Sequence, residues 1–308
     1  MKDEPDAIII VKYLIKNGAD ADDKSKNGLT PLLKVVSVWE SDIDIDLMKY
    51  LIEKGANVNV KTPNGATLLH ELTGSANEYY NEAYGISFHG VGNRLDAMKY
   101  LIEEKKLDVN AKTKDGWTPL YGAVCMSLDV VKYLIEKGAD ANVKTKDGCT
   151  PLHASYISID TMKYLIEKKG LDVNAYSKRT NSALRYSGTP LHVAVTDGNN
   201  IEKIEYLIER GANVDATDAM KRTPRDIARD KGSDTICAIL DEAKLPPAER
   251  AVARERAKYA SENREYDPDR MKALGEQWRR EAQQRRDDNQ RRMDILEGKP
   301  GTTRIVPY

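Results

Sequence analysis

Aromatic residues, cysteines and long apolar runs are all scarce in this 308-residue sequence. There is a single Phe, and aromatic residues make up only 6% of the chain, so any core is thin and spread over many small units. The three cysteines, Cys125, Cys149 and Cys237, share no close spacing, which excludes a disulfide framework and a zinc-binding cysteine motif. No apolar stretch approaches the roughly 18 residues that a membrane-spanning helix needs. The sequence therefore predicts a cytoplasmic protein without a membrane segment.

The chain as a whole also lacks a large excess of positive or negative charge. The formal net charge is −1, which gives no electrostatic argument for nucleic acid as a partner. Charge is nevertheless unevenly distributed: residues 1–243 carry −5, whereas residues 244–308 carry +4 and contain twelve arginines. This change in composition near Lys244 predicts a boundary between a domain at 1–243 and an Arg-rich extension at 244–308.

Two short phrases recur along the first 243 residues. The phrase KYLI stands at 12–15, 49–52, 99–102, 132–135 and 163–166, with the variant EYLI at 205–208. A second phrase, of the type Gly-x-Thr-Pro-Leu, precedes it by half a repeat. Its threonines are Thr30, Thr67, Thr118, Thr150, Thr189 and Thr223. The intervals between these threonines are 37, 51, 32, 39 and 34 residues, so the chain is an array of related units with two longer members.

This pattern resembles the ankyrin repeat, whose period is near 33 and whose signature is T-P-L-H-x-A. The resemblance covers about residues 7–243. It implies an all-α ankyrin-repeat α-solenoid, built from helix-turn-helix repeats with short β-hairpin-like turns, and here followed by a helical tail. It also implies a protein partner on the concave face and the hairpin tips, without a cofactor.

The physical chemistry of one unit supports the same fold. In 129–135, apolar residues fall at the spacing of an amphipathic helix. Gly138 follows the last turn, where a glycine can close a helix in the left-handed conformation. Thr118 can cap the next helix, with Pro119 at its first position. One such helix pair cannot bury its apolar face alone, so the units must stack.

The motif spacing sets the expected domain limits. A half repeat at 1–26 lacks a first helix, because Pro5 leads directly into the helix at 7–16, and it is expected to leave Ile8 and Ile9 partly exposed. Full repeats are expected to start near residues 27, 64, 115, 147 and 187, and a charged capping repeat occupies 221–243. An insertion at 74–93 lengthens one unit. The tail is expected to be helical, with a mobile end after residue 298.

Three histidines share the fourth position of the T-P-L-H phrase: His70, His153 and His192. A metal site would require them to converge, whereas stacking places them about one repeat apart. We therefore predict that each imidazole bonds the backbone of a neighbouring turn, and that the chain binds no metal. A nucleophile with a base in reach, a phosphate loop and a calcium loop are all missing, so no catalytic residue is predicted.

The insertion holds the first group of candidate partner contacts. Tyr79, Tyr80, Tyr84 and the only Phe, Phe88, lie there beside His89, and loops of this length are often functional. Three alternatives stay open: a lid folded on its own repeat, a loop that contacts a partner, and a disordered segment.

The remaining candidates are aromatic residues elsewhere. Trp117 stands at a hairpin tip, with Tyr121 in the histidine position just after it; Trp at that tip is also a common structural filler. Trp278 shares one face of the tail helix with Met271 and Leu274. That helix is interpreted as solvated, with a partner or oligomer helix and nucleic-acid binding as alternatives, so the chain is expected to be monomeric unless the tail associates.

The function predicted from these features is that of a non-catalytic protein-interaction module or scaffold. Lys112, Lys114, Lys144 and Lys146, near the hairpin tips, favour a partner with acidic patches. An alternative rests on the Lys- and Ile-rich sequence KYLIEKGA, which resembles repeats in ankyrin proteins of host-associated bacteria and large DNA viruses. On that hypothesis, the chain is an effector or adaptor whose tail carries a transport or recruitment signal.

Overall fold

The computed structural model describes most of the chain as short helices joined by turns. It covers residues 4–37, 42–74, 91–178, 187–198, 200–245 and 249–250, and the single positions 273, 276, 277, 280, 283, 284 and 287. Contacts divide the chain into two units, 1–227 and 228–308. The domain boundary near residue 244 stays a prediction, because the contact division falls earlier, within one helix.

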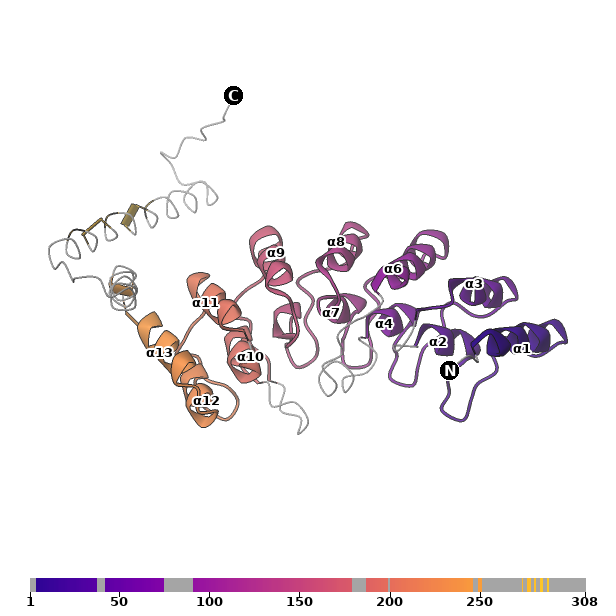
Figure 1. Cartoon of the computed structure of the whole chain (residues 1–308), viewed down its shortest axis with the longest axis horizontal. Helices are drawn as coiled ribbons and strands as arrows, with labels where there is room; N and C mark the ends of the chain where they lie inside the picture. Colours follow the sequence, from indigo (N-terminus) through magenta and orange to yellow (C-terminus); the bar gives the residue numbers. More distant parts are fainter. Residues whose placement is uncertain are drawn as a thin grey trace, which may run out of the picture. The chain divides into compact units, whose positions relative to one another are not determined.

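Unit 1 contains two rows of helices (Figure 1). One row holds the first helix of each repeat: α2 (Pro31–Val36), α4 (Leu68–Thr73), α7 (Pro119–Ala123) and α10 (Pro190–Asp197). The other row holds the second helices: α1 (Glu4–Lys16), α3 (Ile45–Glu53), α6 (Val91–Lys99), α8 (Leu128–Glu136), α9 (Ile159–Lys169) and α11 (Ile201–Glu209). First helices of consecutive repeats pack together, as α2 does on α4 and α4 on α7, and each also packs on its own second helix. The predicted all-α repeat solenoid is confirmed.

Most helix starts follow the sequence signals, but Thr118, which was expected to cap α7, makes no capping hydrogen bond. Thr30 caps α2 by accepting a hydrogen bond from the Leu33 N–H at 3.3 Å, and Pro31 follows at the first helical position. Second helices start at polar caps as well: Ser127 accepts from the Val130 N–H at the start of α8. These caps satisfy N–H groups that a helix leaves without an internal partner, which matters in helices this short.

One first helix is reduced to a single turn, which corrects the expectation of two helices in every unit. Pro151–His153 form only a 3₁₀ turn, η2, and Ala154 then returns to an extended conformation. Only eight positions separate Thr150 from Ser158, the cap of α9, so no length remains for a second helical turn before the chain must reverse.

The second helix that starts as α6 ends in a π-helical turn, η1 (Tyr100–Glu104). The Lys105 N–H reaches the Tyr100 carbonyl at 3.3 Å, which closes a wider ring than an α-helix does. Lys106 follows with φ of +59°, a left-handed conformation uncommon in non-glycine residues.

The core of unit 1 runs between the two rows as a chain of small clusters. With the exception of Leu14, the leucines of both motif phrases are buried in it, with at most 1% of their surface exposed. They are Leu32, Leu51, Leu68, Leu101, Leu120, Leu134, Leu152, Leu165, Leu191 and Leu207. Because each cluster lies between two adjacent repeats, its hydrophobic stabilisation belongs to the stack and not to any repeat alone.

α12 (Pro224–Asp230) spans the boundary between the units, and α13 (Asp234–Ala243) belongs to unit 2. α13 buries Ile236 and Leu240. Further along, the described tail positions between 273 and 287 are helical and exposed, and the Gln283 amide donates to the Asp287 carboxylate one turn later at 2.9 Å.

Candidate interaction surface

The turns between repeats are built on one repeated hydrogen-bond pattern. In the turns that start at residues 25, 62, 113, 145 and 218, a side-chain oxygen accepts the backbone N–H four residues later, as Thr113 does from Trp117 at 3.1 Å and Thr145 from Cys149 at 3.0 Å. The glycine between them, Gly116 or Gly148, has a φ near +90°, which an L side chain rarely adopts. The bond and the glycine together fix the shape of the turn.

Neighbouring turns are joined through their backbones. The Lys114 N–H donates to the Asn64 carbonyl at 2.8 Å, the Lys146 N–H to Asp115 at 3.0 Å, and the Lys178 N–H to Asp147 at 2.7 Å. The lysine backbone is therefore held in register with the tip of the preceding turn. Successive lysine side chains come from equivalent points along the array.

Lysines on these turns form a surface that we call the hairpin lysines. They alternate with inward residues: Thr113 and Thr145 are buried, whereas the lysines on either side of each are exposed. The set comprises Lys24, Lys26, Lys61, Lys112, Lys114, Lys144, Lys146 and Lys178, all exposed. The sequence analysis named four of them; Lys24 and Lys26, which flank Ser25 in the same pattern, could have been found in the same way. Acidic side chains also occur here, at Asp23, Asp115 and Asp147.

The predicted role of the histidines is confirmed. In each case the ring bonds back to the threonine three residues earlier and forward to a carbonyl of the next repeat. His70 Nδ1 accepts the Thr67 N–H at 3.1 Å, and its Nε2 lies 3.0 Å from the Trp117 carbonyl. His153 does the same with Thr150 and, at 3.2 Å, with Gly188.

These contacts fix the protonation state of the imidazoles. Because Nδ1 accepts a backbone N–H, it carries no proton, so Nε2 carries the proton and donates it to the carbonyl. Burial strips water from the charged form and lowers the pKa of His70 and of His153 to about 4. Burial lowers the pKa of His192 as well. These histidines are neutral structural connectors, each of which ties one repeat to the next.

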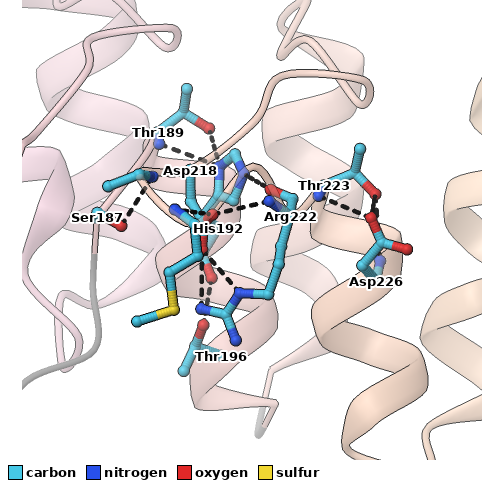
Figure 2. A network of polar contacts seen from close by, with 10 residues as sticks. Ser187, Thr189, His192, Thr196, Asp218, Arg222, Thr223 and Asp226 are labelled. Atoms are coloured by element: carbon cyan, nitrogen blue, oxygen red, sulfur yellow. Dashed lines mark hydrogen bonds and ion pairs between the residues drawn. The ribbon is translucent and has the colours of Figure 1, made fainter.

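Figure 2 shows the connector formed by His192 and its surroundings. His192 Nε2 lies 3.2 Å from the Arg222 carbonyl, and the Arg222 guanidinium pairs with Asp218 at 2.8 Å. Asp218 also accepts the N–H groups of Met220 and Arg222, both at 2.8 Å. This buried carboxylate therefore replaces the threonine of earlier turns and closes the last turn before α12.

Trp117 and Tyr121, two predicted partner contacts, are mostly buried, with 6% and 9% of their surface exposed. Their rings meet edge to face with centroids 4.1 Å apart. Tyr121 occupies the histidine position, and the hydroxyl of Thr118 is consequently buried without a hydrogen-bond partner. Both rings thus pack the turn onto its helix. A role in partner contact stays a prediction for them.

The other predicted contacts lie outside the described residues. They are Tyr79, Tyr80, Tyr84, Phe88 and His89 of the insertion, and Trp278 of the tail.

Second helices carry a different set of contacts between repeats. In four of the five KYLI phrases the lysine approaches the tyrosine ring of the next repeat, as Lys49 does with Tyr100 at 5.3 Å and Lys163 with Tyr206 at 5.8 Å. The Tyr206 hydroxyl donates to Glu167 of the preceding repeat at 3.1 Å. We call this series the tyrosine ladder.

Among the described residues, no group of three or more His, Cys, Asp or Glu side chains is placed to hold a metal ion. None of the helices described is long and apolar enough to cross a membrane.

Comparison with known proteins gives matches over most of unit 1. A family model for ankyrin repeats in three copies matches residues 6–79 and 89–177, and a model for a single ankyrin repeat matches residues 188–219. Alpha-latrocrustotoxin-Lt1a of Latrodectus tredecimguttatus is 49% identical over 47 residues, which is 15% of this chain and 3% of the toxin.

Plant potassium channels are also similar over short segments. Potassium channel AKT1 of Oryza sativa subsp. indica is 38% identical over 77 residues, which is 25% of this chain and 8% of the channel. AKT1 of Arabidopsis thaliana is 44% identical over 59 residues, which is 19% of this chain and 7% of the channel. The chain thus spans less than a tenth of each of these relatives. Since the family models cover well over half of the sequence, the chain belongs to the ankyrin-repeat family, whose repeats generally serve as protein–protein interaction modules.

Proposed function

We propose that this chain is a non-catalytic adaptor that holds a protein partner along its hairpin edge, the surface that carries the hairpin lysines. The partner presents an acidic segment to this surface. The proposal is carried by the register of the hairpin lysines: backbone bonds between turns place exposed cations at equivalent points of successive repeats. Cations spaced in this way match the charges of an extended acidic segment better than those of a compact acidic cluster.

Preorganisation supports the same role. The turns are fixed by side-chain bonds and by the histidine connectors, so binding orders few additional groups and less contact energy is lost to entropy. Charge complementarity at such a rim mainly raises the association rate and selects the partner.

The test compares two charge-reversed forms of the full chain. One form carries Lys112→Glu, Lys144→Glu and Lys146→Glu on the hairpin edge. Its matched control carries Lys54→Glu, Lys137→Glu and Lys168→Glu, which are exposed lysines of the second-helix row. Partners are captured from the cell that makes the protein, and binding of the purified partner is then measured against salt.

The hairpin form is expected to bind at least about tenfold more weakly, since three rim charges each contribute fractions of a kcal/mol to about 1 kcal/mol. The control is expected to bind as the unaltered chain does. Equal binding by all three forms would refute the acidic-segment proposal.

The insertion and the tail enter this function as further proposals. Deleting residues 75–90 of the insertion, which leaves α6 and the contacts of Asn93 with Ile43 in place, is expected to reduce partner capture with little change in melting temperature; unchanged capture would exclude a contact role. The effector hypothesis predicts that removing residues 298–308 blocks export and leaves binding intact.

A further inference from the structure

Three asparagines of this chain are followed directly by glycine: Asn17, Asn27 and Asn64. All three are exposed, and their side chains differ in the hydrogen bonds they make. The Asn17 side chain donates from Nδ2 to the Tyr13 carbonyl at 2.8 Å. Within the part of the chain that the structure describes, no hydrogen bond reaches the side chain of Asn27. Of the three, Asn64 is the one that accepts hydrogen bonds on its side-chain carbonyl oxygen.

The Asn64 Oδ1 is held from two sides at the tip of its turn. It accepts the Ala66 N–H at 3.3 Å, and it also accepts the Thr62 hydroxyl. The bond from Ala66 closes the side chain over the peptide between Asn64 and Gly65, as in an Asx turn. The side-chain carbonyl carbon, Cγ, therefore lies on the side of the Gly65 nitrogen.

The residue that follows the asparagine separates Asn64 from other asparagines with the same bond. Asn57 and Asn213 also accept the backbone N–H two residues later, at 2.9 Å and 3.0 Å. Both are followed by valine, whose branched side chain crowds the backbone nitrogen, whereas Gly65 has no side chain. Among the described residues, Asn64 alone combines a tethered side-chain carbonyl with an open nitrogen next to it.

We propose that Asn64 is a site of spontaneous deamidation, a modification that needs water as its only co-reactant. The Gly65 nitrogen gives up its proton to water and attacks Asn64 Cγ. The new C–N bond closes a succinimide ring, the bond from Cγ to Nδ2 breaks, and Nδ2 takes a proton from water and leaves as ammonia. One water molecule then opens the ring at either of its carbonyl carbons, which gives aspartate or isoaspartate.

Two features of the turn favour the attack. The tether holds Cγ near its nucleophile, so less conformational freedom is lost on the way to the transition state. Negative charge then develops on Oδ1, where the Ala66 N–H and the Thr62 hydroxyl already donate hydrogen bonds.

Asn27 stands at the same place in the preceding turn and provides a matched site. The Gly65 N–H donates to the Thr62 carbonyl at 2.8 Å. The Gly28 N–H donates to the Ser25 carbonyl at the same distance, 2.8 Å. This bond withholds the attacking nitrogen equally in both turns, so the two sites differ in the contacts of the asparagine side chain.

Aspartate at position 64 is compatible with the fold. Later turns hold Asp115 and Asp147 directly before the glycine, and their carbonyls accept an N–H of the next turn. The Asn64 carbonyl accepts that of Lys114 in the same way. Isoaspartate would instead lengthen the backbone by one carbon and displace this carbonyl. Deamidation therefore either places an acid among the hairpin lysines or breaks the bond between two turns.

The first experiment measures deamidation of the full chain at neutral pH by mass spectrometry of its peptides, in the folded state and in urea. Dividing the rate of each site in the folded chain by its rate in urea removes the effect of neighbouring residues in the sequence. This ratio is expected to be at least about threefold larger for Asn64 than for Asn27, since a hydrogen bond to the reacting oxygen is worth a factor of that order. Equal ratios, or a larger ratio at Asn27, would overturn the proposal.

Two variants of Thr62 test the contacts of Oδ1 themselves. Thr62→Val removes one donor and is expected to slow deamidation at Asn64 about threefold while leaving Asn27 unchanged. Thr62→Ser keeps the hydroxyl and is expected to keep the rate. Hydrogen exchange of the Gly65 N–H shows whether the turn stays closed in each variant. An unchanged or faster rate in Thr62→Val with a closed turn would contradict the role of the hydroxyl.

The effect of the modification on binding rests on the proposed function. Asn64→Asp, one product of the reaction, is expected to weaken binding of the acidic partner about threefold. Asn64→Gln keeps the amide and is expected to bind as the unaltered chain does. Deamidation rates are measured without a partner, so equal binding by both variants would count against the acidic-segment proposal and not against the modification site.

Discussion

The histidine connectors and the tyrosine ladder both tie each repeat to the next, but they do so in different surroundings. His153 is buried, neutral and bonded on both ring nitrogens. In the ladder, Lys163 reaches both the Tyr206 ring and Glu202 from a position open to water. Repeats are therefore linked by desolvated hydrogen bonds at the histidine connectors and by screened charges at the tyrosine ladder.

This contrast predicts how each set responds to change. A buried polar group left without its partner costs the full desolvation penalty, whereas an exposed pair that is broken regains water. The contribution of the histidine connectors to the free energy of unfolding should depend on pH and on close packing. The contribution of the tyrosine ladder should depend only weakly on salt. The four predictions below separate the two sides.

The largest expected effect is that of pH. The histidines have an ordinary pKa of 6.5 when unfolded, and burial lowers the pKa of His70 and His153 to about 4 in the folded chain. Between these values the unfolded chain binds protons that the folded chain refuses. The free energy of unfolding is therefore full above pH 6.5 and falls as the pH drops toward 4, by up to about 3 kcal/mol for each of these two residues.

Urea unfolding at pH 7.5, 6 and 5 at constant ionic strength measures this loss. Burial raises the pKa of Glu71, which works in the opposite direction near pH 4.5 and above, but it is one group against three histidines. Adding salt at pH 7.5 is the control and should change little. A flat pH profile would contradict the neutral connectors.

The next effect is steric and falls on Gly188. A Cβ there would stand 2.7 Å from the His192 ring, at a φ of +106°, so Gly188→Ala should cost about 3 kcal/mol from backbone strain and overpacking combined. The control is Gly138→Ala, at the end of a second helix, where φ is +95° and nothing lies within 4 Å. It should cost only about 1 kcal/mol. Equal losses of unfolding free energy for the two variants, measured with urea, would show that packing at the histidine connector is no tighter than at the end of the second helix.

A smaller effect compares two threonines at the same repeat position. The Thr150 hydroxyl bonds His153 at 3.0 Å, whereas the Thr118 hydroxyl is buried without a partner because Tyr121 stands in the histidine position. Thr150→Val should lower the free energy of unfolding by about 1–2 kcal/mol, and Thr118→Val should be neutral within about 0.5 kcal/mol or slightly stabilising. Guanidinium unfolding followed by circular dichroism measures both; a loss from Thr118→Val would be the contrary result.

The smallest effect belongs to the ladder. Lys163→Gln removes both the ring contact with Tyr206 and the ion pair with Glu202 and should cost about 0.5 kcal/mol at low salt, since the side chains of Lys163 and Glu202 are open to water. The loss should shrink further in 0.5 M salt, where charges are screened within about 4–5 Å. Lys168→Gln, at an exposed lysine of the same helix, gives the baseline. A salt-independent loss would place the ladder with the buried connectors.

Much of the fold could be predicted from the sequence because its two recurring motifs act through interactions between residues close together in the chain. Thr-Pro starts a helix by capping, and the leucine of KYLI is buried in each later second helix of the array, so the motifs gave the repeats and the histidine contacts. Partner contact by the candidate residues stays a prediction. Trp117 was placed at a hairpin tip as a contact or a structural filler, and its ring packs inward against Tyr121, an outcome that depends on contacts between residues and on no local rule.

By itself, the sequence determined that this protein is a stack of helix pairs, because the capping and apolar patterns act within a few residues and repeat. Tertiary structure alone decided which side chains those pairs leave free. It shortened one first helix to Pro151–His153, lined up the hairpin lysines and turned the Trp117 ring inward against Tyr121. The physical reason is that exposure and long-range hydrogen bonds arise between repeats, where stacking brings together residues more than twenty positions apart.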